Sequence, residues 1–354
     1  PLDQSGRQGP LLARPIRLLL FVLGEMLVIG FFLLLAWVGL EVVILLEGYK
    51  LISLPWSVAE DMRPDDTGGT LVFLARSVAE AGAAVAHINA PYNYVVADVD
   101  GNIGHFTGGR VPVRKIGDGS LPLAADQGEA AWAGMIPANE MPGTVNPARG
   151  WVGTANHRTV PASYPYAYSN YFAASWRYRR MLELLDPPAR HDVMDHWRYM
   201  WDTRNLMAAR TASILVHALG ARPDTSELAK MLAAWNLHDD IDQVGPTIFQ
   251  SVIRHLAQLT FQDELGPDLT DRLLDASYFW QERLVRLMEQ DAPGWFDDVT
   301  TSALESRDEL IHRAGLAALD DLNTAYGKNR QRWTWGRVHA VTFFSPTVPG
   351  HWAA

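Results

Sequence analysis

The longest run of hydrophobic positions lies near the beginning of the chain, from Leu18 to Leu46, and its only charged residues are Glu25 and Glu41. About 20 apolar residues are enough to cross a lipid bilayer as a helix. The pattern therefore predicts a transmembrane helix over residues 18–47, after an irregular segment of residues 1–17. A buried core helix is the alternative that the same pattern allows. In a membrane, Glu25 is expected to lie near the headgroups, to be protonated or to face a partner helix, because an ionised carboxylate is costly at the bilayer centre.

The charges that flank this run predict its orientation. Three arginines come before it, whereas Glu41 and Glu47 lie toward its far end. Because positive charges concentrate on the cytoplasmic side of membrane helices, the N-terminus is expected in the cytoplasm. Everything after Lys50 is then expected outside it, in a periplasmic or extracellular location. The three arginines are Arg7, Arg14 and Arg17.

After this run, short hydrophobic stretches and turn residues predict a strand-rich part over residues 48–168. Tyr94–Ala97 and Ile103–Phe106 are two such stretches, and the Asp-Gly-Asn sequence at 100–102 between them is typical of a β-hairpin. Trp151–Ala155 is predicted as a further strand that ends at Asn156, where a side-chain amide can meet a ligand.

Two more elements are expected before the hairpin. Leu51–Val58 reads as a strand that Pro55 interrupts, because proline lacks the backbone N–H that a strand needs. Leu71–Ile88 is rich in alanine, has apolar residues at helical spacing and is followed by Pro91, so it predicts one helix.

From residue 169 the hydrophobic positions recur at helical spacing, and residues 169–330 are predicted to be helical. Residues 331–354 follow as a return segment, in which Trp333–His339 is expected to form a strand or a turn. The predicted helical stretches are Tyr171–Leu185, Arg190–Leu219, Ser226–Trp235, Pro246–Leu259, Leu269–Gln290 and Ser306–Tyr326.

The composition narrows the range of functions. The chain has 354 residues, 48% of them hydrophobic, which is enough for a substantial core. Its formal net charge of -10 argues against nucleic acid as a partner, because an acidic composition does not require a basic surface. The absence of cysteine excludes disulfides, thiolate metal sites and a cysteine nucleophile.

Several phrases of the chain, taken together, resemble one known family in order and spacing. They include the hairpin, Trp132-Ala133-Gly134-Met135-Ile136-Pro137 and Gly150-Trp151-Val152-Gly153-Thr154-Ala155-Asn156. They are similar to the penicillin-acylase (penicillin amidase) family of N-terminal-nucleophile hydrolases. The resemblance runs from about Leu51 to Pro346. It implies an α+β fold, a partial αββα sandwich with a helical block, behind the predicted transmembrane helix.

The resemblance also implies a catalytic machinery. In this family an N-terminal Ser attacks an amide carbonyl with its own α-amine as base, and an Asn side chain helps to stabilise the oxyanion. The match places that Asn at Asn156 and an active-site arginine at Arg177, within Trp176-Arg177-Tyr178-Arg179-Arg180. A turn-capping Asn and an ordinary surface cation are the alternatives for these two residues. No cofactor or metal is expected. The position that matches the calcium-binding carboxylate of the family lies near Tyr168 and is not acidic.

The departures from the family pattern shape the expected function. The family's nucleophile lies far upstream of the hairpin, whereas about ninety residues precede Asn93 here. The chain is therefore expected to lack its own nucleophile, to be inactive in isolation and to leave an open sheet edge that a partner chain covers. This favours a membrane-anchored accessory or scaffold subunit, a pseudoenzyme. The alternative is one chain of a split amidohydrolase, with the nucleophile on another chain.

Overall fold

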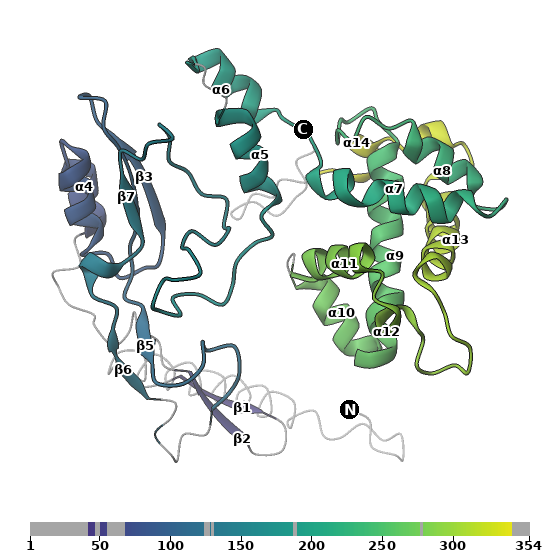
Figure 1. The fold of residues 1–354 in the computed structure, drawn as a ribbon, viewed down its shortest axis with the longest axis horizontal. Coiled ribbons are helices and arrows are strands. Elements are labelled where there is room, and N and C mark those ends of the chain that lie inside the picture. The colour runs from purple at the N-terminus through teal and green to yellow at the C-terminus, as the bar shows by residue number, and fades with distance from the viewer. Residues whose placement is uncertain are drawn as a thin grey trace, which may run out of the picture. The chain divides into compact units, whose positions relative to one another are not determined.

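The structure is a computed structural model in which the chain divides into two compact units (Figure 1). The first comprises residues up to 154 together with 159–171, and the second comprises 155–158 and the residues from 172 on. The first unit contains the strands, and the second contains most of the helices. The residues that the structure describes are 42–46, 50–54, 68–123, 128, 131–186, 190–276 and 279–341.

The predicted β-hairpin is confirmed in the first unit. Strand β3 (Asn93–Ala97) pairs antiparallel with β4 (Ile103–Thr107). Strand β7 (Gly143–Val145) pairs with the other side of β4, so the strand order is β3-β4-β7. This third strand comes from a distant segment that the local hydrophobic pattern does not identify. The other short elements here are the paired strands β5 (Pro112–Arg114) and β6 (Trp132–Met135) and the 3₁₀ helix η1 (Ala138–Glu140).

The carboxylate of Asp98 organises the hairpin turn. Its Oδ1 accepts hydrogen bonds from the backbone N–H groups of Asp100 at 3.1 Å and Asn102 at 2.9 Å. Its Oδ2 accepts from the backbone N–H of Val78 at 3.2 Å, which ties the turn to the first residue of α4 (Val78–Val85), the helix that precedes the hairpin. The hydrogen bonds from Asn102 hold the pKa of Asp98 below its usual value. Gly101 completes the turn at φ +86°, a conformation that glycine adopts without strain.

The helix predicted at Leu71–Ile88 is instead two helices, α3 (Gly68–Leu74) and α4 (Val78–Val85). The break occurs because the side chain of Ser77 accepts a hydrogen bond from the backbone N–H of Glu80 and caps α4. Helix α4 lies against β3 and β4 (Figure 1). A Cβ added at Gly104 would lie 2.7 Å from the side chain of Val78, so the close approach requires glycine there.

The end of the predicted transmembrane helix is a strand. β1 (Val42–Leu46) pairs antiparallel with β2 (Lys50–Leu54), which is the described part of the strand predicted at 51–58. The helix prediction is wrong over β1, where successive β-branched residues favour an extended backbone. Residues 18–41 lie outside the described residues. Within the described ranges, no helix is both long and apolar enough to cross a bilayer.

The strand predicted at Trp151–Ala155 is not formed, and these residues are irregular. The backbone groups of Ala155 are bonded to side chains in place of a neighbouring strand. Its N–H donates to Nδ1 of His157 at 3.4 Å, and its carbonyl oxygen accepts from Arg177 at 3.0 Å. Asn156 therefore lies in a bend of the second unit and not at the end of a strand.

The helical character of the second unit is confirmed, but two predicted runs are each divided. Residues 190–219 form two helices because the side chain of Asn205 accepts from the backbone N–H of Ala208 and caps the second. Residues 269–290 are divided after Asp275. The helices are α5 (Trp176–Leu185), α6 (Val193–Met200), α7 (Leu206–Gly220), α8 (Ser226–Ala233), α9 (Gly245–Leu265), α10 (Pro267–Asp275), α11 (Phe279–Gln290), α12 (Pro293–Phe296) and α13 (Arg307–Tyr326).

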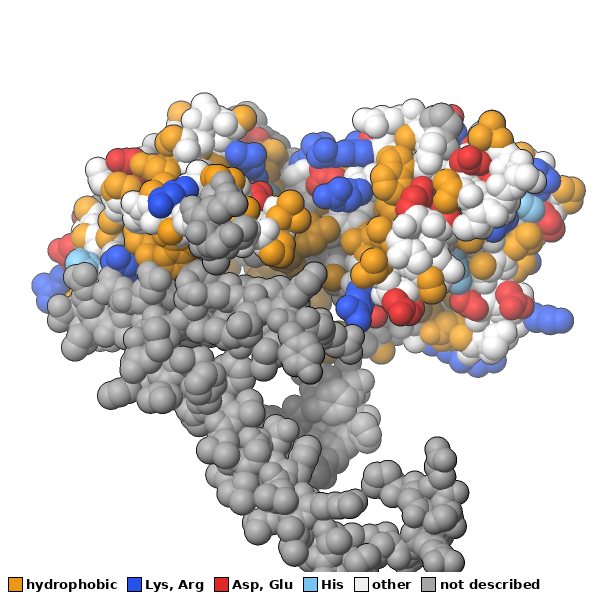
Figure 2. Space-filling model, turned by 90° about the horizontal axis from the view of Figure 1, so that it is seen from below, with side chains coloured by type: hydrophobic (Ala, Val, Ile, Leu, Met, Phe, Trp, Pro, Cys, Tyr) orange, Lys and Arg blue, Asp and Glu red, His pale blue; other side chains and the backbone are white. Residues whose placement is uncertain are grey.

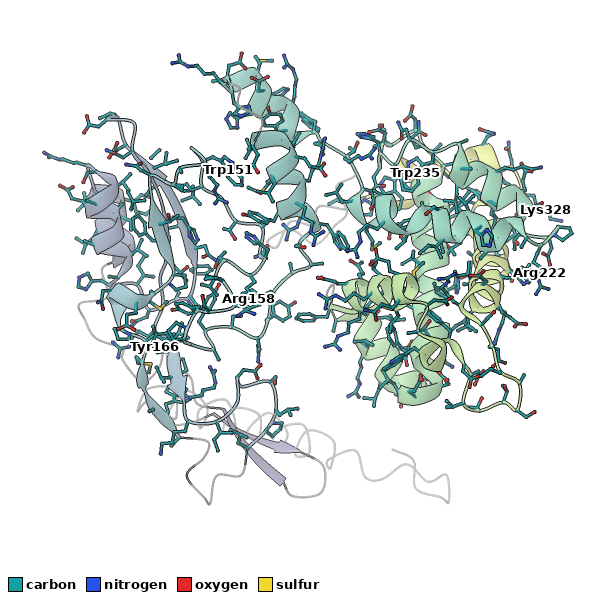
Figure 3. All side chains as sticks on the ribbon, in the orientation of Figure 1. Trp151, Arg158, Tyr166, Arg222, Trp235 and Lys328 are labelled. Carbon is teal, nitrogen blue, oxygen red and sulfur yellow. The ribbon has the colours of Figure 1, made fainter. Side chains whose placement is uncertain are left out.

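Helix α9 forms the centre of the helical core. Its apolar side chains at Ile248, Phe249, Val252 and Leu256 are completely buried. Helices α8, α10, α11, α12, α13 and α14 (Trp335–Val338) pack against it, and α7 packs against α8, α11 and α13. Trp235, labelled in Figure 3, covers its first turn and donates from Nε1 to the carbonyl oxygen of His238 at 2.7 Å.

The return segment is helical and not a strand. Trp333 is completely buried, follows the 3₁₀ helix η2 (Arg330–Arg332) and donates from Nε1 to the carbonyl oxygen of Gly327 at 2.8 Å. The short helix α14 (Trp335–Val338) comes next. The backbone N–H groups of its first two residues donate to the carbonyl oxygens of Gln243 and Ile241. These donors are therefore satisfied by a loop and not by a neighbouring strand. Residues 342–354 lie outside the described residues.

One helix carries a stripe of exposed apolar side chains. Hydrophobic, acidic and basic side chains are interspersed on the face of the described residues that Figure 2 shows. On α6, by contrast, apolar residues recur at helical spacing and each is more than half exposed. We call this set the α6 apolar stripe: Val193, Met194, Trp197, Met200 and Trp201.

The crossing of α13 and α7 generates a stability prediction at Gly315, in the middle of α13. A Cβ there would lie 2.3 Å from the buried Cδ2 of Leu219. We expect Gly315→Ala to lower the free energy of unfolding by about 1 kcal/mol, because overpacking costs about 1–3 kcal/mol and the better helix propensity of alanine offsets only part of it. The measurement is chemical denaturation followed by circular dichroism.

The matched control is Gly220→Ala at the end of α7. A Cβ there would meet Ala229 at 3.6 Å, an ordinary van der Waals contact, and stability should be unchanged or slightly higher. A Gly315→Ala protein as stable as the wild type would show that α7 and α13 do not pack this closely.

Candidate active site

The two residues that the sequence points to are in direct contact in the second unit. Arg177 is the second residue of α5. Its Nη2 donates to Oδ1 of Asn156 at 2.9 Å and to the carbonyl oxygen of Ala155 at 3.0 Å. One guanidinium nitrogen therefore binds both the side chain of Asn156 and the backbone that precedes it.

The backbone of Asn156 has a left-handed conformation, with φ +60°. Asparagine tolerates this region better than most non-glycine residues. The carbonyl oxygen of Asn156 accepts a hydrogen bond from the backbone N–H of Ala173 at 2.7 Å. The bend is thus fastened to the segment that leads into α5 as well as to α5 itself.

These contacts determine how the amide of Asn156 is oriented. A guanidinium has only donors, so the atom that faces Arg177 must be the amide oxygen. The amide nitrogen, with its two N–H donors, then faces away from Arg177. Among the described residues it meets no hydrogen-bond acceptor, and Asn156 is exposed. The arrangement therefore presents a positioned pair of N–H donors that a ligand oxygen can accept.

The local pattern did not identify the ring stack beside Asn156. The imidazole of His157 is buried and lies on the phenol ring of Tyr178, with ring centroids 3.5 Å apart and planes 11° apart. His157 follows Asn156 in the chain, and Tyr178 follows Arg177. Adjacency to the two candidate residues was the only signal in the sequence.

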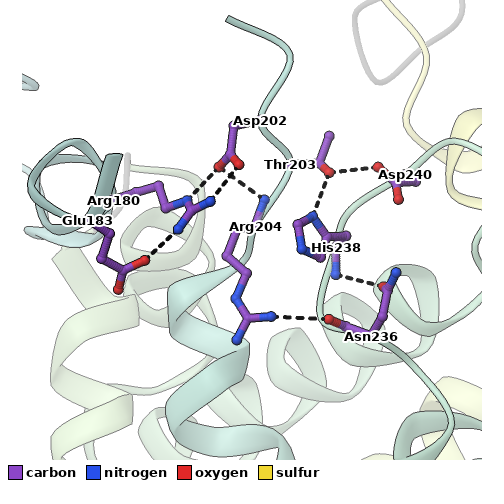
Figure 4. Close-up of polar contacts among 8 residues, drawn as sticks. All are labelled: Arg180, Glu183, Asp202, Thr203, Arg204, Asn236, His238 and Asp240. Atoms are coloured by element: carbon purple, nitrogen blue, oxygen red, sulfur yellow. Dashed lines mark hydrogen bonds and ion pairs between the residues drawn. The ribbon is translucent and has the colours of Figure 1, made fainter. Parts of the chain in front are cut away.

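An ion pair anchors α5 to the rest of the helical unit. The guanidinium of Arg180 forms a bidentate pair with Asp202, at 2.8 Å for both bonds, and also reaches Glu183 (Figure 4). The hydrogen bonds between these two side chains raise the pKa of Arg180 and lower the pKa of Asp202. Asp202 lies in the link between α6 and α7, so the pair holds α5 beside the start of α7. Bidentate geometry of this kind fixes orientation.

A cavity of about 390 Å³ opens beside Arg177. Its lining includes Trp176, Arg204 and Asp239. Burial raises the pKa of Asp239 to about 6, although hydrogen bonds from Asn205 partly offset the effect. Thr203 follows Asp202 and connects this link with the loop that carries His238 and Asp240. Its Oγ1 donates to Oδ1 of Asp240 and contacts Nδ1 of His238 (Figure 4).

Cofactor and metal ligands are not grouped in the described ranges. No group of three or more His, Asp or Glu side chains there could hold a metal ion. The hydroxyl of Tyr168 is hydrogen-bonded to Thr159 at 2.7 Å. The ring of His339 stacks on Trp335 with centroids 4.6 Å apart, which is a structural contact.

Comparisons with known proteins identify relatives of this chain. The model of the penicillin amidase family matches residues 4–352. The acyl-homoserine lactone acylase QuiP of Pseudomonas fluorescens is 30% identical over 286 residues, which are 75% of this chain and 35% of that protein. The acyl-homoserine lactone acylase QuiP of Pseudomonas aeruginosa is 28% identical over 290 residues, 77% of this chain and 34% of that protein. The chain thus spans about a third of the length of these relatives.

A shorter match and a solved structure agree with these relatives. Penicillin acylase 2 proenzyme of Pseudomonas sp. (strain SE83) is 31% identical over 172 residues, 48% of this chain and 22% of that protein. The thermostable penicillin G acylase from Alcaligenes faecalis superposes with a TM-score of 0.59 at 17% identity, over 83% of this chain and 62% of that chain. This structural likeness shows a mixed helical and sheet fold of the penicillin acylase kind.

The raised pKa of Asp239 predicts a pH dependence of stability. The folded state holds the proton of Asp239 up to a pH of about 6, whereas the unfolded state releases it near a pH of about 4. Between these values the folded state binds more protons, so stability is expected to fall as pH rises through this window. Asp239→Asn, which stays neutral and still accepts from Asn205, should remove this contribution.

The measurement compares the melting temperatures of Asp239→Asn and wild type from about pH 4 to pH 7. The variant should gain stability relative to wild type as the pH rises. Asp271→Asn on the exposed surface of α10 is the control and should follow the wild-type profile. A constant difference between Asp239→Asn and wild type would contradict the assignment.

Proposed function

The chain belongs to the penicillin amidase family, and we propose that it supplies the oxyanion-stabilising part of an amidohydrolase that cleaves acyl amides. The names of its relatives, which cover about three quarters of the chain, favour acyl-homoserine lactones as the first substrates to test. Phenylacetyl amides and long-chain acyl amides are the other substrates that the family resemblance suggests.

The hydrogen bond from Arg177 to Oδ1 of Asn156 carries this proposal. It leaves the amide nitrogen of Asn156 on the side away from Arg177, where its N–H groups are available to a developing oxyanion. A donor of this kind stabilises the tetrahedral intermediate more than the substrate carbonyl, because the negative charge on the oxygen grows during attack.

The reaction follows the scheme that the family implies. The oxygen of an N-terminal Ser bonds to the amide carbonyl carbon, and the α-amine of that Ser takes the hydroxyl proton. The carbonyl oxygen becomes the oxyanion that Asn156 stabilises. The C–N bond then breaks, the amine leaves with the proton, and water hydrolyses the acyl ester. The nucleophile is proposed to lie on polypeptide outside the described residues.

A second proposal is that the chain serves as an accessory or scaffold subunit without catalysis of its own. The α6 apolar stripe favours this role, because exposed apolar side chains at helical spacing are typical of a surface that binds another protein. In either proposal another polypeptide covers the stripe. The two proposals differ in whether Asn156 contributes to a rate.

Membrane anchoring is a further part of the proposal. It rests on residues 18–41, the largely apolar part of the predicted span that precedes β1. As a helix these residues would extend about 36 Å, against about 30 Å for the hydrocarbon core. The arginines before them favour a cytoplasmic N-terminus.

Asn156→Gly is the substitution that tests the catalytic proposal. Glycine adopts φ +60° freely, so this variant removes the amide without straining the bend. Loss of an oxyanion donor costs about 10²–10³-fold in kcat, and KM should change little. The measurement is steady-state hydrolysis of acyl-homoserine lactones by the protein isolated from its own host, with all co-purifying polypeptides.

Two further variants at this position serve as controls. Asn156→Asp keeps an oxygen for Arg177 but offers the oxyanion a negative charge, and it should be at least as slow as Asn156→Gly. Asn156→Ala adds a backbone cost of about 1–2 kcal/mol and should also melt at a lower temperature. If the Asn156→Gly protein is as fast as wild type, the catalytic proposal fails and the scaffold proposal is favoured.

Membrane anchoring is tested by fractionation of cells that produce the protein. The protein should stay in the membrane pellet after an alkaline carbonate wash and dissolve only in detergent. Protease added to right-side-out vesicles should digest the part after Lys50, which is expected on the outer side. Release by carbonate would refute anchoring, and protection from protease would reverse the orientation.

A further inference from the structure

The bend that carries Asn156 is held by two successive residues of one helix. Arg177 binds the side chain of Asn156 and the carbonyl oxygen of Ala155. Tyr178, the next residue of α5, stacks on the ring of His157. The candidate oxyanion donor therefore lies between one fixed polar contact and one fixed ring contact, both from the first turn of α5.

The ring of His157 also binds the beginning of the bend. Its Nδ1 accepts a hydrogen bond from the backbone N–H of Ala155 at 3.4 Å, which requires that nitrogen to be unprotonated. The imidazole is buried and nearly parallel to the phenol ring of Tyr178, with centroids only 3.5 Å apart. The stack restricts rotation of the His157 ring, and the ring in turn restricts the peptide that enters Asn156.

We propose that Tyr178, acting through His157, is a positioning residue that sets the direction of the Asn156 amide nitrogen. This inference rests on the proposed function. Arg177 holds the amide oxygen of Asn156 and the carbonyl oxygen of Ala155, and the N–H of Ala173 holds the carbonyl oxygen of Asn156. The stacked ring of His157 adds a contact to the N–H of Ala155, which these bonds do not reach. A donor that must point at an oxyanion needs such support, because a misplacement of about 1 Å can cost about 10²-fold in rate.

The surroundings of Tyr178 separate this role from general packing. Helix α5 has no completely buried residue, and Tyr178 is not among the side chains that pack against the hydrophobic core, whereas Trp176 is. The ion pair of Arg180 with Asp202 holds α5 in place independently of Tyr178. Shortening Tyr178 should therefore loosen the bend and leave the helical core folded.

The first test compares variants of Tyr178 in the protein isolated from its own host. Tyr178→Phe keeps the stacked ring and should retain kcat within about threefold. Tyr178→Leu removes the ring and should lower kcat by about 10–10²-fold at unchanged KM. Tyr178→Met, which fills the space with a flexible chain, should behave like Tyr178→Leu and serves if the leucine variant does not fold. Equal rates for the Phe, Leu and Met variants would overturn the proposal.

The second test is a double-mutant cycle with Asn156→Gly, using acyl-homoserine lactone hydrolysis. If Tyr178 acts through the amide of Asn156, then Tyr178→Leu should have little further effect on kcat once that amide is gone. Tyr326→Leu at the end of α13 controls for general loss of packing and should lower the melting temperature without lowering kcat.

The outcomes separate failure of this inference from failure of the proposed function. If Asn156→Gly slows the enzyme but Tyr178→Leu costs the same factor in both backgrounds, Tyr178 does not act through Asn156. The proposed function then still stands. If Asn156→Gly leaves the rate unchanged, the proposed function fails, and the positioning role fails with it.

Discussion

The candidate site depends on one interaction, the hydrogen bonding of the Arg177 guanidinium to Asn156 and Ala155. It joins a bend outside the helical core to the first turn of α5. It also decides which end of the Asn156 amide faces the protein. Without it, a side chain at the surface could rotate about χ1 and χ2, and its N–H groups would have no fixed direction. A donor fixed before the reaction needs no reorganisation when charge develops on the substrate.

This interaction is only as rigid as the helix that supplies it. Helix α5 has no completely buried residue, and polar contacts add to the packing of its Trp176 against the core. The bidentate pair of Arg180 with Asp202 attaches it to the start of α7, and α7 packs in the core against α8, α11 and α13. A chain of contacts therefore leads from the apolar core, through one charge-assisted pair, to the bend with Asn156. Binding groups on a rigid support of this kind hold their geometry better than groups on an unsupported loop.

The elements that the local sequence pattern predicted wrongly share a physical cause. Trp151–Ala155 looks like a strand, but the backbone of Ala155 is bonded to His157 and Arg177 in place of a neighbouring strand. The stretch at Trp333–His339 contains strand-forming residues, yet its N–H groups bond to the loop before α9. Val42–Leu46 continues an apolar run but pairs as a strand with β2. In each case contacts with other segments decided a conformation that local propensity leaves open.

The sequence by itself determined the elements whose signals are local. The hairpin follows from two apolar stretches around an Asp-Gly-Asn turn, and the helical unit follows from apolar residues at helical spacing. The family resemblance also indicated Asn156 and Arg177 as residues of interest. Only the tertiary structure decided that these two side chains meet, that His157 stacks on Tyr178 and that burial raises the pKa of Asp239. Asn156 and Arg177 are 21 positions apart, and no periodic pattern specifies a contact between a bend and a helix, because its geometry depends on how the whole unit packs.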